Sequence, residues 1–191
     1  MKSYRELPEG YSELLKVDLQ NNKKLMIFVN ALALLITVLM VVPMHFAVPI
    51  TTLFSLEKGI LDYLFRFGVL LVLIIVYMIL HELVHGITMK ACGTQKVKYG
   101  FTGIYAFAGS SDYYDKRSYI LIALAPVVLW GAVLSVILPF VSFEWFWVVY
   151  FIQIMNISGA AGDFYVTFKF IKLPKDILVS DSGTAMTVYS K

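Results

Sequence analysis

Cysteine and charged residues are both scarce in this chain of 191 residues. The single cysteine, Cys92, excludes a disulfide within the chain, so cysteine usage indicates neither secretion nor an oxidising compartment. Charged residues make up only 15% of the sequence and hydrophobic residues 59%, a balance far outside the range of soluble globular proteins. The composition therefore excludes an ordinary soluble enzyme and predicts an integral membrane protein.

The sequence also lacks the signals of a cleaved leader and of a nucleic-acid-binding surface. Residues 1–24 are too long and too acidic for the start of a signal peptide, and no small-residue cleavage site follows the first apolar run. The net charge is +3, but the basic residues stand at the ends of apolar runs, where they set topology and meet lipid headgroups. We therefore expect the N-terminus to be retained, and we expect no nucleic-acid partner.

Four apolar stretches are long enough to cross a lipid bilayer as helices. They cover residues 25–42, 63–89, 118–140 and 143–171. Between the second and third, glycines and β-forming residues predict a short β-hairpin with strands near residues 97–99 and 101–107. The predicted fold class is mainly α, a polytopic membrane protein with about four transmembrane helices and one hairpin. A polar, partly helical segment (1–24) and a polar tail without periodicity (172–191) flank the membrane core of residues 25–171.

Local signals predict where these helices begin, bend and end. Pro43 follows the first stretch directly, so we expect that helix to end before it. Asp115 or Ser118 is the expected N-cap of the third helix. Pro126 and Gly131 lie inside that helix and predict a kink or a close helix contact.

The distribution of basic residues predicts the topology. With four spans and a cytoplasmic N-terminus, all but two of the 16 basic residues fall on the cytoplasmic side, the exceptions being Lys58 and Arg66. An excess of lysine and arginine marks the cytoplasmic loops of membrane proteins. The sequence therefore predicts a multi-pass protein of the cell membrane, surrounded by the lipid bilayer, with both termini in the cytoplasm.

One short motif in the second apolar stretch predicts chemistry. It reads His81-Glu82-Leu83-Val84-His85, an HExxH pattern. On a helix, His81 and His85 lie one turn apart on one face and are spaced to bind a single Zn²⁺, with Glu82 beside them as candidate general base. Ionisable residues are costly and rare inside a membrane, so three of them within five residues favour a functional site.

A catalytic zinc ion usually takes three protein ligands, so a third is needed. The candidates are His45, Glu57, Asp62, Cys92, Asp112, Asp115, Glu144 and Asp163. Counted from the outer ends of their helices, His81 and Asp163 both lie roughly 27 Å along at ~1.5 Å per residue. Asp163 is the prediction, although it could instead pair with Lys169 at a helix end, and Asp112 or Asp115 could serve only as turn or cap residues.

Glycine and alanine surround the predicted third ligand. Asn156, Gly159 and Asp163 fall on one stripe of a continuous helix, and the small residues from Gly159 to Gly162 permit close approach of another helix.

Together these motifs resemble the site-2 protease class of intramembrane zinc metalloproteases. The whole chain resembles, more closely, a small bacterial membrane family of zincin peptidases of largely unassigned function, through His81 to Gly86, Ala123 to Pro126, and Asn156 to Asp163. The resemblance implies that Asn156 binds substrate or the oxyanion. The wider class has a proline and then Leu-Asp-Gly-Gly where this chain has Gly159 and Gly162-Asp163-Phe164, which leaves open how the helix breaks there.

The predicted function is intramembrane zinc proteolysis near the cytoplasmic leaflet. His81, His85 and Asp163 would hold Zn²⁺, and Glu82 would take a proton from the zinc-activated water that attacks a membrane protein or peptide substrate. An edge strand in residues 96–108 could hold an unwound substrate, or could be a structural cap over the site. The alternative is a zinc-binding membrane scaffold, sensor or immunity-type protein without proteolysis.

Overall fold

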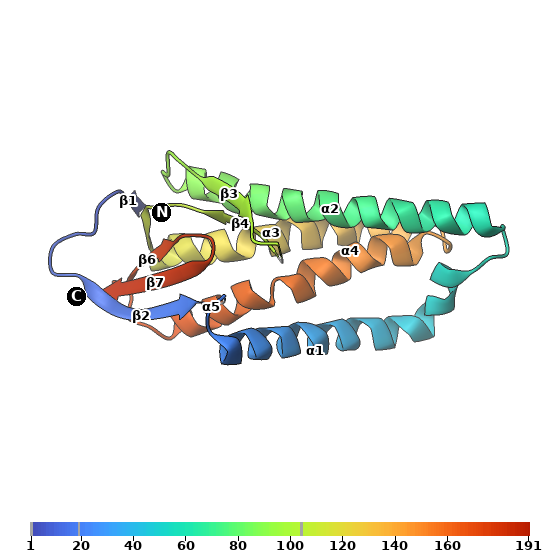
Figure 1. The fold of residues 1–191 in the computed structure, drawn as a ribbon, viewed down its shortest axis with the longest axis horizontal. Helices are drawn as coiled ribbons and strands as arrows, with labels where there is room; N and C mark the ends of the chain where they lie inside the picture. The colour runs from blue at the N-terminus through green and yellow to red at the C-terminus, as the bar shows by residue number, and fades with distance from the viewer. Residues whose placement is uncertain (1, 19, 104) are drawn as a thin grey trace.

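The helices of this protein lie along its long axis, and a small β-sheet closes one end (Figure 1). This arrangement comes from a computed structural model that describes residues 2–18, 20–103 and 105–191. The helical elements are α1 (Lys23–Ala47), η1 (Ile50–Phe54), α2 (Ile60–Ala91), α3 (Lys116–Ile137), η2 (Leu138–Phe140), α4 (Phe146–Gly159) and α5 (Ala161–Ile171). The fold is thus mainly helical, as predicted, with a sheet in addition.

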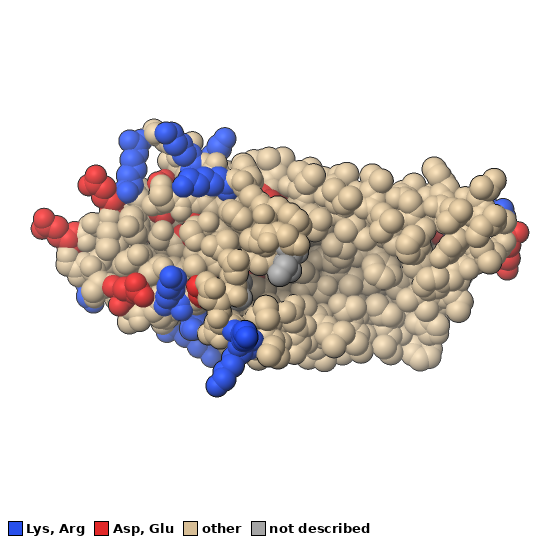
Figure 2. Space-filling model, viewed as in Figure 1, with Lys and Arg blue, Asp and Glu red and all other residues tan. Residues whose placement is uncertain are grey.

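Three helical segments of the described chain are long and apolar enough to cross a membrane: α1, α2, and α3 continued through η2. Large apolar side chains cover their outer faces, for example Leu34 (65% exposed), Phe65 (63%) and Val128 (66%). Such continuous apolar surface is costly in water, so it indicates association with a membrane. Figure 2 shows the same pattern, with lysine and arginine gathered at the sheet end and a long uncharged stretch beside it.

The first helix is longer than predicted. Asn22 caps its start, because the Asn22 side chain accepts a hydrogen bond from the Leu25 backbone N–H at 3.1 Å. The prediction that the helix ends before Pro43 is wrong, since α1 continues through Pro43 to Ala47. Membrane helices tolerate an interior proline because neighbouring groups satisfy the freed backbone carbonyl. Asp115 caps α3 and accepts from the Ser118 N–H at 2.8 Å, one of the two predicted caps.

The fourth predicted span consists of two helices. The backbone leaves the α-helical path at Ala160, whose φ and ψ are −81° and 14°, and α5 begins at Ala161. Ala160 and Ala161 are fully buried, so a larger side chain at the junction would collide with its neighbours. That α4 and α5 together cross the membrane stays a prediction.

Both ends of the chain join one antiparallel sheet. Its strands lie in the order β1 (Ser3–Tyr4), β5 (Tyr113–Asp115), β6 (Leu178–Asp181), β7 (Ala185–Ser190), β2 (Ser12–Asp18). The prediction of a partly helical N-terminal segment is wrong, and the tail is not irregular. The sheet forms because alternate residues such as Val17, Val179 and Val188 are buried against the ends of α2, α3 and α5.

A second, two-stranded sheet lies between α2 and α3 in the chain. It consists of β3 (Lys98–Phe101) and β4 (Ala106–Gly109), so the second strand begins later than predicted. The phenyl ring of Phe107 fills the space that glycines leave at Gly100 and Gly183. At the end of β4 the Ser110 N–H donates to the Asp181 carbonyl at 2.7 Å, which ties this hairpin to the β6–β7 turn.

Candidate metal centre

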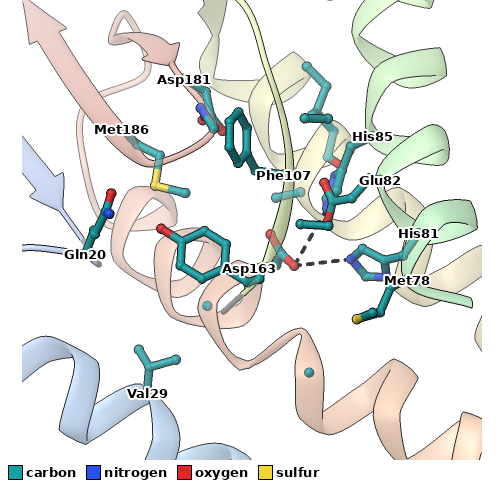
Figure 3. A pocket seen from close by; sticks show the side chains of 18 of the residues that line it. Gln20, Val29, Met78, His81, Glu82, His85, Phe107, Asp163, Asp181 and Met186 are labelled. Atoms are coloured by element: carbon teal, nitrogen blue, oxygen red, sulfur yellow. Dashed lines mark hydrogen bonds and ion pairs between the residues drawn. The ribbon is translucent and has the colours of Figure 1, made fainter. Parts of the chain in front are cut away.

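Helix α2 places both motif histidines on one face. His81 and His85 lie one turn apart, with ring centroids 4.9 Å from each other. The carboxylate of Asp163, from α5, faces both: its Oδ2 is 3.8 Å from Nε2 of His81 and 3.9 Å from Nε2 of His85 (Figure 3). The sequence thus located two histidines and an aspartate more than seventy positions later in the chain, and the fold brings the three together.

The break before α5 explains the position of Asp163. Because a new helix begins at Ala161, Asp163 lies in its first turn, where unpaired backbone N–H groups and the helix dipole favour a carboxylate. Gly159 and Gly162 line the space beside it and leave room for a bound group. Lys169, the alternative partner considered for Asp163, instead lies 3.4 Å from the Tyr165 hydroxyl.

Three of the other candidate ligands have partners elsewhere. His45 accepts a hydrogen bond from the Ile50 N–H at 3.1 Å, Asp62 pairs with Arg66 at 2.9 Å, and Glu144 pairs with Lys58 at 2.7 Å. Across residues 2–18, 20–103 and 105–191, the one group of three metal-binding side chains is His81, His85 and Asp163.

The donor set suits zinc. Two imidazole nitrogens and one carboxylate oxygen lie within 4.8 Å of one another, which matches the three-ligand sets of catalytic zinc sites. Ligand atoms on a tetrahedral zinc ion lie about 3.4 Å apart, given bonds of about 2.1 Å. The observed separations of 3.8 and 3.9 Å therefore require only small side-chain movements.

Glu82 lies between the histidines and the β3–β4 hairpin. Its carboxylate accepts a hydrogen bond from the backbone N–H of Ala108 in β4. The hairpin packs closely on the motif, because a side chain at Gly86 would collide with the Tyr99 hydroxyl. These contacts support the interpretation of the hairpin as a structural cap over the site. The Ala108 amide of β4 already contacts Glu82, so it is not free to pair with a substrate strand.

A cavity of about 480 Å³ opens beside these residues. It is lined by the metal-binding group and by α1, β4, α3 and the C-terminal sheet, through residues that include Met26, Asn30, Phe107, Tyr119, Asp181 and Met186. Asp181, which the sequence did not suggest, accepts hydrogen bonds from the Tyr119 hydroxyl at 2.9 Å and the Gly183 N–H at 2.8 Å. Burial raises the pKa of Asp181 to about 6 in spite of these bonds.

Asn156 lies deeper than the resemblance implies. It is fully buried in α4 and is not among the residues that line the cavity. Its Oδ1 accepts from the Tyr77 hydroxyl at 2.9 Å, and its Nδ2 donates to the Val127 carbonyl at 3.1 Å. Asn156 therefore contacts Tyr77 and Val127, whereas Asp163 faces the two histidines directly. Tyr77 was also missed, although it lies one turn before His81 on the same helix.

Comparison with known proteins agrees with this chemistry. An "Uncharacterized 24.7 kDa protein in gap 5'region" of Pyrococcus woesei is 28% identical over 118 residues, covering 59% of this chain and 51% of the relative. The chain thus spans about half the length of that relative. No solved structure matches. A family model described as "Putative zincin peptidase" matches residues 74–178, more than half of the chain, and includes the whole metal-binding group. The chain therefore belongs to this zincin peptidase family.

Proposed function

We propose that this protein is an intramembrane zinc metalloprotease of the site-2 type, which hydrolyses peptide bonds of membrane-associated substrates near the cytoplasmic leaflet. The observation that supports this most directly is the position of Glu82. It shares one cavity with His81, His85 and Asp163 at the end of three apolar helices.

Each residue has one task in the proposed reaction. His81, His85 and Asp163 hold the ion, and zinc, when bound, supplies a Lewis acid that acidifies water and polarises a peptide carbonyl. Glu82 accepts the proton of the attacking water and later donates it to the leaving amine. Glu82 lines the cavity, and the backbone N–H of Ala108 helps to hold its carboxylate there.

The helix arrangement favours an extended substrate from the membrane. α1 packs against α4 and α5, whereas α2 packs against α3 and α4, so α1 and α2 stand on opposite sides of the cavity (Figure 1). A volume of about 480 Å³ suits several residues of an unwound chain. A helical substrate must unwind there, because its internal hydrogen bonds otherwise shield the peptide bonds.

The decisive experiment uses the full chain reconstituted with zinc and a set of quenched transmembrane peptides. Glu82→Gln should bind one zinc ion per chain and lose cleavage by roughly 10²–10⁴-fold, the usual contribution of a general base. Glu144→Gln, an exposed change that breaks only the pair with Lys58, should cleave like the unaltered protein. Stoichiometric zinc without cleavage by the unaltered protein would instead favour the non-proteolytic zinc-binding alternative.

A further inference from the structure

Both motif histidines use their second ring nitrogen to contact the protein. Nδ1 of His85 lies 2.8 Å from the backbone carbonyl of Ile122 in α3. Nδ1 of His81 lies 2.8 Å from the hydroxyl of Tyr77, one turn earlier on α2. A neutral imidazole has one N–H and one lone pair, so these contacts decide which nitrogen is left to bind a metal.

The contact of His85 fixes its tautomer directly. A carbonyl oxygen can only accept, so Nδ1 of His85 must bear the proton and Nε2 must bear the lone pair. The Ile122 carbonyl is available because the residue four positions later in the same helix is Pro126, which has no N–H to donate. The interior proline of α3 thus leaves an acceptor at the position of His85.

The contact of His81 is fixed through a longer chain of hydrogen bonds. The Val127 carbonyl can only accept, so the atom of Asn156 facing it at 3.1 Å is the Nδ2 amide, and Oδ1 must face Tyr77. That Oδ1 takes the single proton of the Tyr77 hydroxyl at 2.9 Å. The hydroxyl oxygen can then only accept from Nδ1–H of His81.

The opposite tautomer of His81 would leave buried groups unpaired. If the Tyr77 hydroxyl donated to Nδ1, the Asn156 Oδ1 would face an oxygen lone pair inside a fully buried site. Leaving a buried acceptor unsatisfied is unfavourable. An Nε2–H on His81 would also point at Asp163 from 3.8 Å, too far for a hydrogen bond and with no lone pair for a metal.

We infer that Pro126 and Asn156 are positioning residues of the metal centre, which act through the Ile122 carbonyl and the Tyr77 hydroxyl to hold both histidines with Nε2 free for a zinc ion. This inference rests on the proposed function. Neither Pro126 nor Asn156 would touch the metal ion, and both lie on helices other than the one that contains the motif. Both residues are buried, Pro126 in α3 and Asn156 in α4, and both helices contact α2.

Pro126→Ala tests the His85 contact with a control from the same protein. Alanine restores an N–H that competes with His85 for the Ile122 carbonyl, while it favours the helix. We expect zinc affinity to fall roughly tenfold, the lower end for an outer-shell change, while thermal stability in detergent is equal or higher. Pro43→Ala makes the same change inside α1, away from the metal-binding group, and should leave zinc affinity unchanged.

Tyr77→Phe and Asn156→Leu test the His81 contact. Each should lower zinc affinity by roughly tenfold to hundredfold, and the double variant should be no worse than Tyr77→Phe alone because both act through one hydroxyl. Tyr150→Phe removes a comparable hydrogen bond, from the Tyr150 hydroxyl to the Met40 carbonyl at 3.1 Å, and is the matched control.

The readouts are the zinc dissociation constant, measured against a chelator, and the visible spectrum of the Co²⁺-loaded protein. Weaker zinc binding together with shifted cobalt bands in Tyr77→Phe and Pro126→Ala, but not in the controls, supports the inference. Unchanged affinity and spectra in both variants overturn it, even if the protein is an active protease. If the unaltered protein binds no zinc, the proposed function itself fails.

Discussion

His81 and His85 are two of only three histidines in the chain, and the third provides a natural control. His45 lies in the last turn of α1, where it accepts from the Ile50 backbone. His81→Ala and Asp163→Asn should each reduce zinc affinity by more than the roughly tenfold to hundredfold typical of outer-shell changes. His45→Ala should bind zinc normally. Metal analysis of the purified variants at matched free zinc checks this, and equal binding in all three would contradict the ligand assignment.

Asp181 predicts a pH-dependent stability. Its pKa is about 6 in the folded protein against 3.8 for the free side chain, so the folded state binds the proton more tightly. Its stabilising contribution is therefore complete below pH 4 and is lost as pH rises through about 6, with a magnitude of up to roughly 3 kcal/mol. Asp181→Asn should remove this slope, whereas Asp176→Asn, at an exposed position in the same tail, should keep it. Unfolding midpoints between pH 4 and 7 test the difference.

How far the site could be predicted differs from residue to residue. The two histidines and Glu82 could be predicted from the local spacing of the HExxH motif. Asp163 could be predicted because it lies at the same depth as His81 in the fourth apolar stretch. The buried position of Asn156 does not follow, because its partners Tyr77 and Val127 come from two other helices. Tyr77 could have been found from its spacing of four residues before His81.

At the scale of elements, the β6–β7 turn supports β4, and β4 supports Glu82. Gly183 has a φ of +88°, and a side chain there would collide with Phe107 in β4. Gly183→Ala should therefore displace β4 and slow cleavage while zinc, held by other elements, stays bound. Gly10 has a similar φ of +83° but nothing near it, so Gly10→Ala imposes the same backbone strain without the collision. Cleavage rate and zinc content, measured on both variants, separate the collision with Phe107 from the backbone strain. Equal cleavage rates in the two variants would show that β4 does not support Glu82.

The long helices were predictable in the main and the five-stranded sheet was not, for a physical reason. A membrane helix satisfies its own backbone, so a continuous apolar run is sufficient evidence for it. A short strand needs a partner, and β2 finds its partner in β7, at the other end of the chain. The alternation of Met186 and Val188 is too brief to predict a strand without that knowledge.

At the scale of the whole molecule, the two ends differ in charge and in chemistry. Both termini and most lysines lie toward the sheet end (Figures 1 and 2). The cavity lies near the same end, since residues of the sheet line it. The excess of basic residues predicts that this end faces the cytoplasm. In a Cys92→Ala background, a membrane-impermeant thiol reagent should label Glu57→Cys in whole cells and Lys175→Cys only after permeabilisation. Labelling in the reverse order would place the proposed cleavage at the outer leaflet.

The pairing of β2 with β7 also has a consequence for synthesis. Residues 12–18 leave the ribosome long before residues 185–190, so β2 has no partner while the membrane helices are being inserted. Asp163 and the β6–β7 turn that braces β4 likewise appear late. The proposed protease would therefore be inactive while it is being translated, because its metal site is incomplete until Asp163 has been made. Its own helices would be inserted into the membrane before a complete site exists that could cleave them.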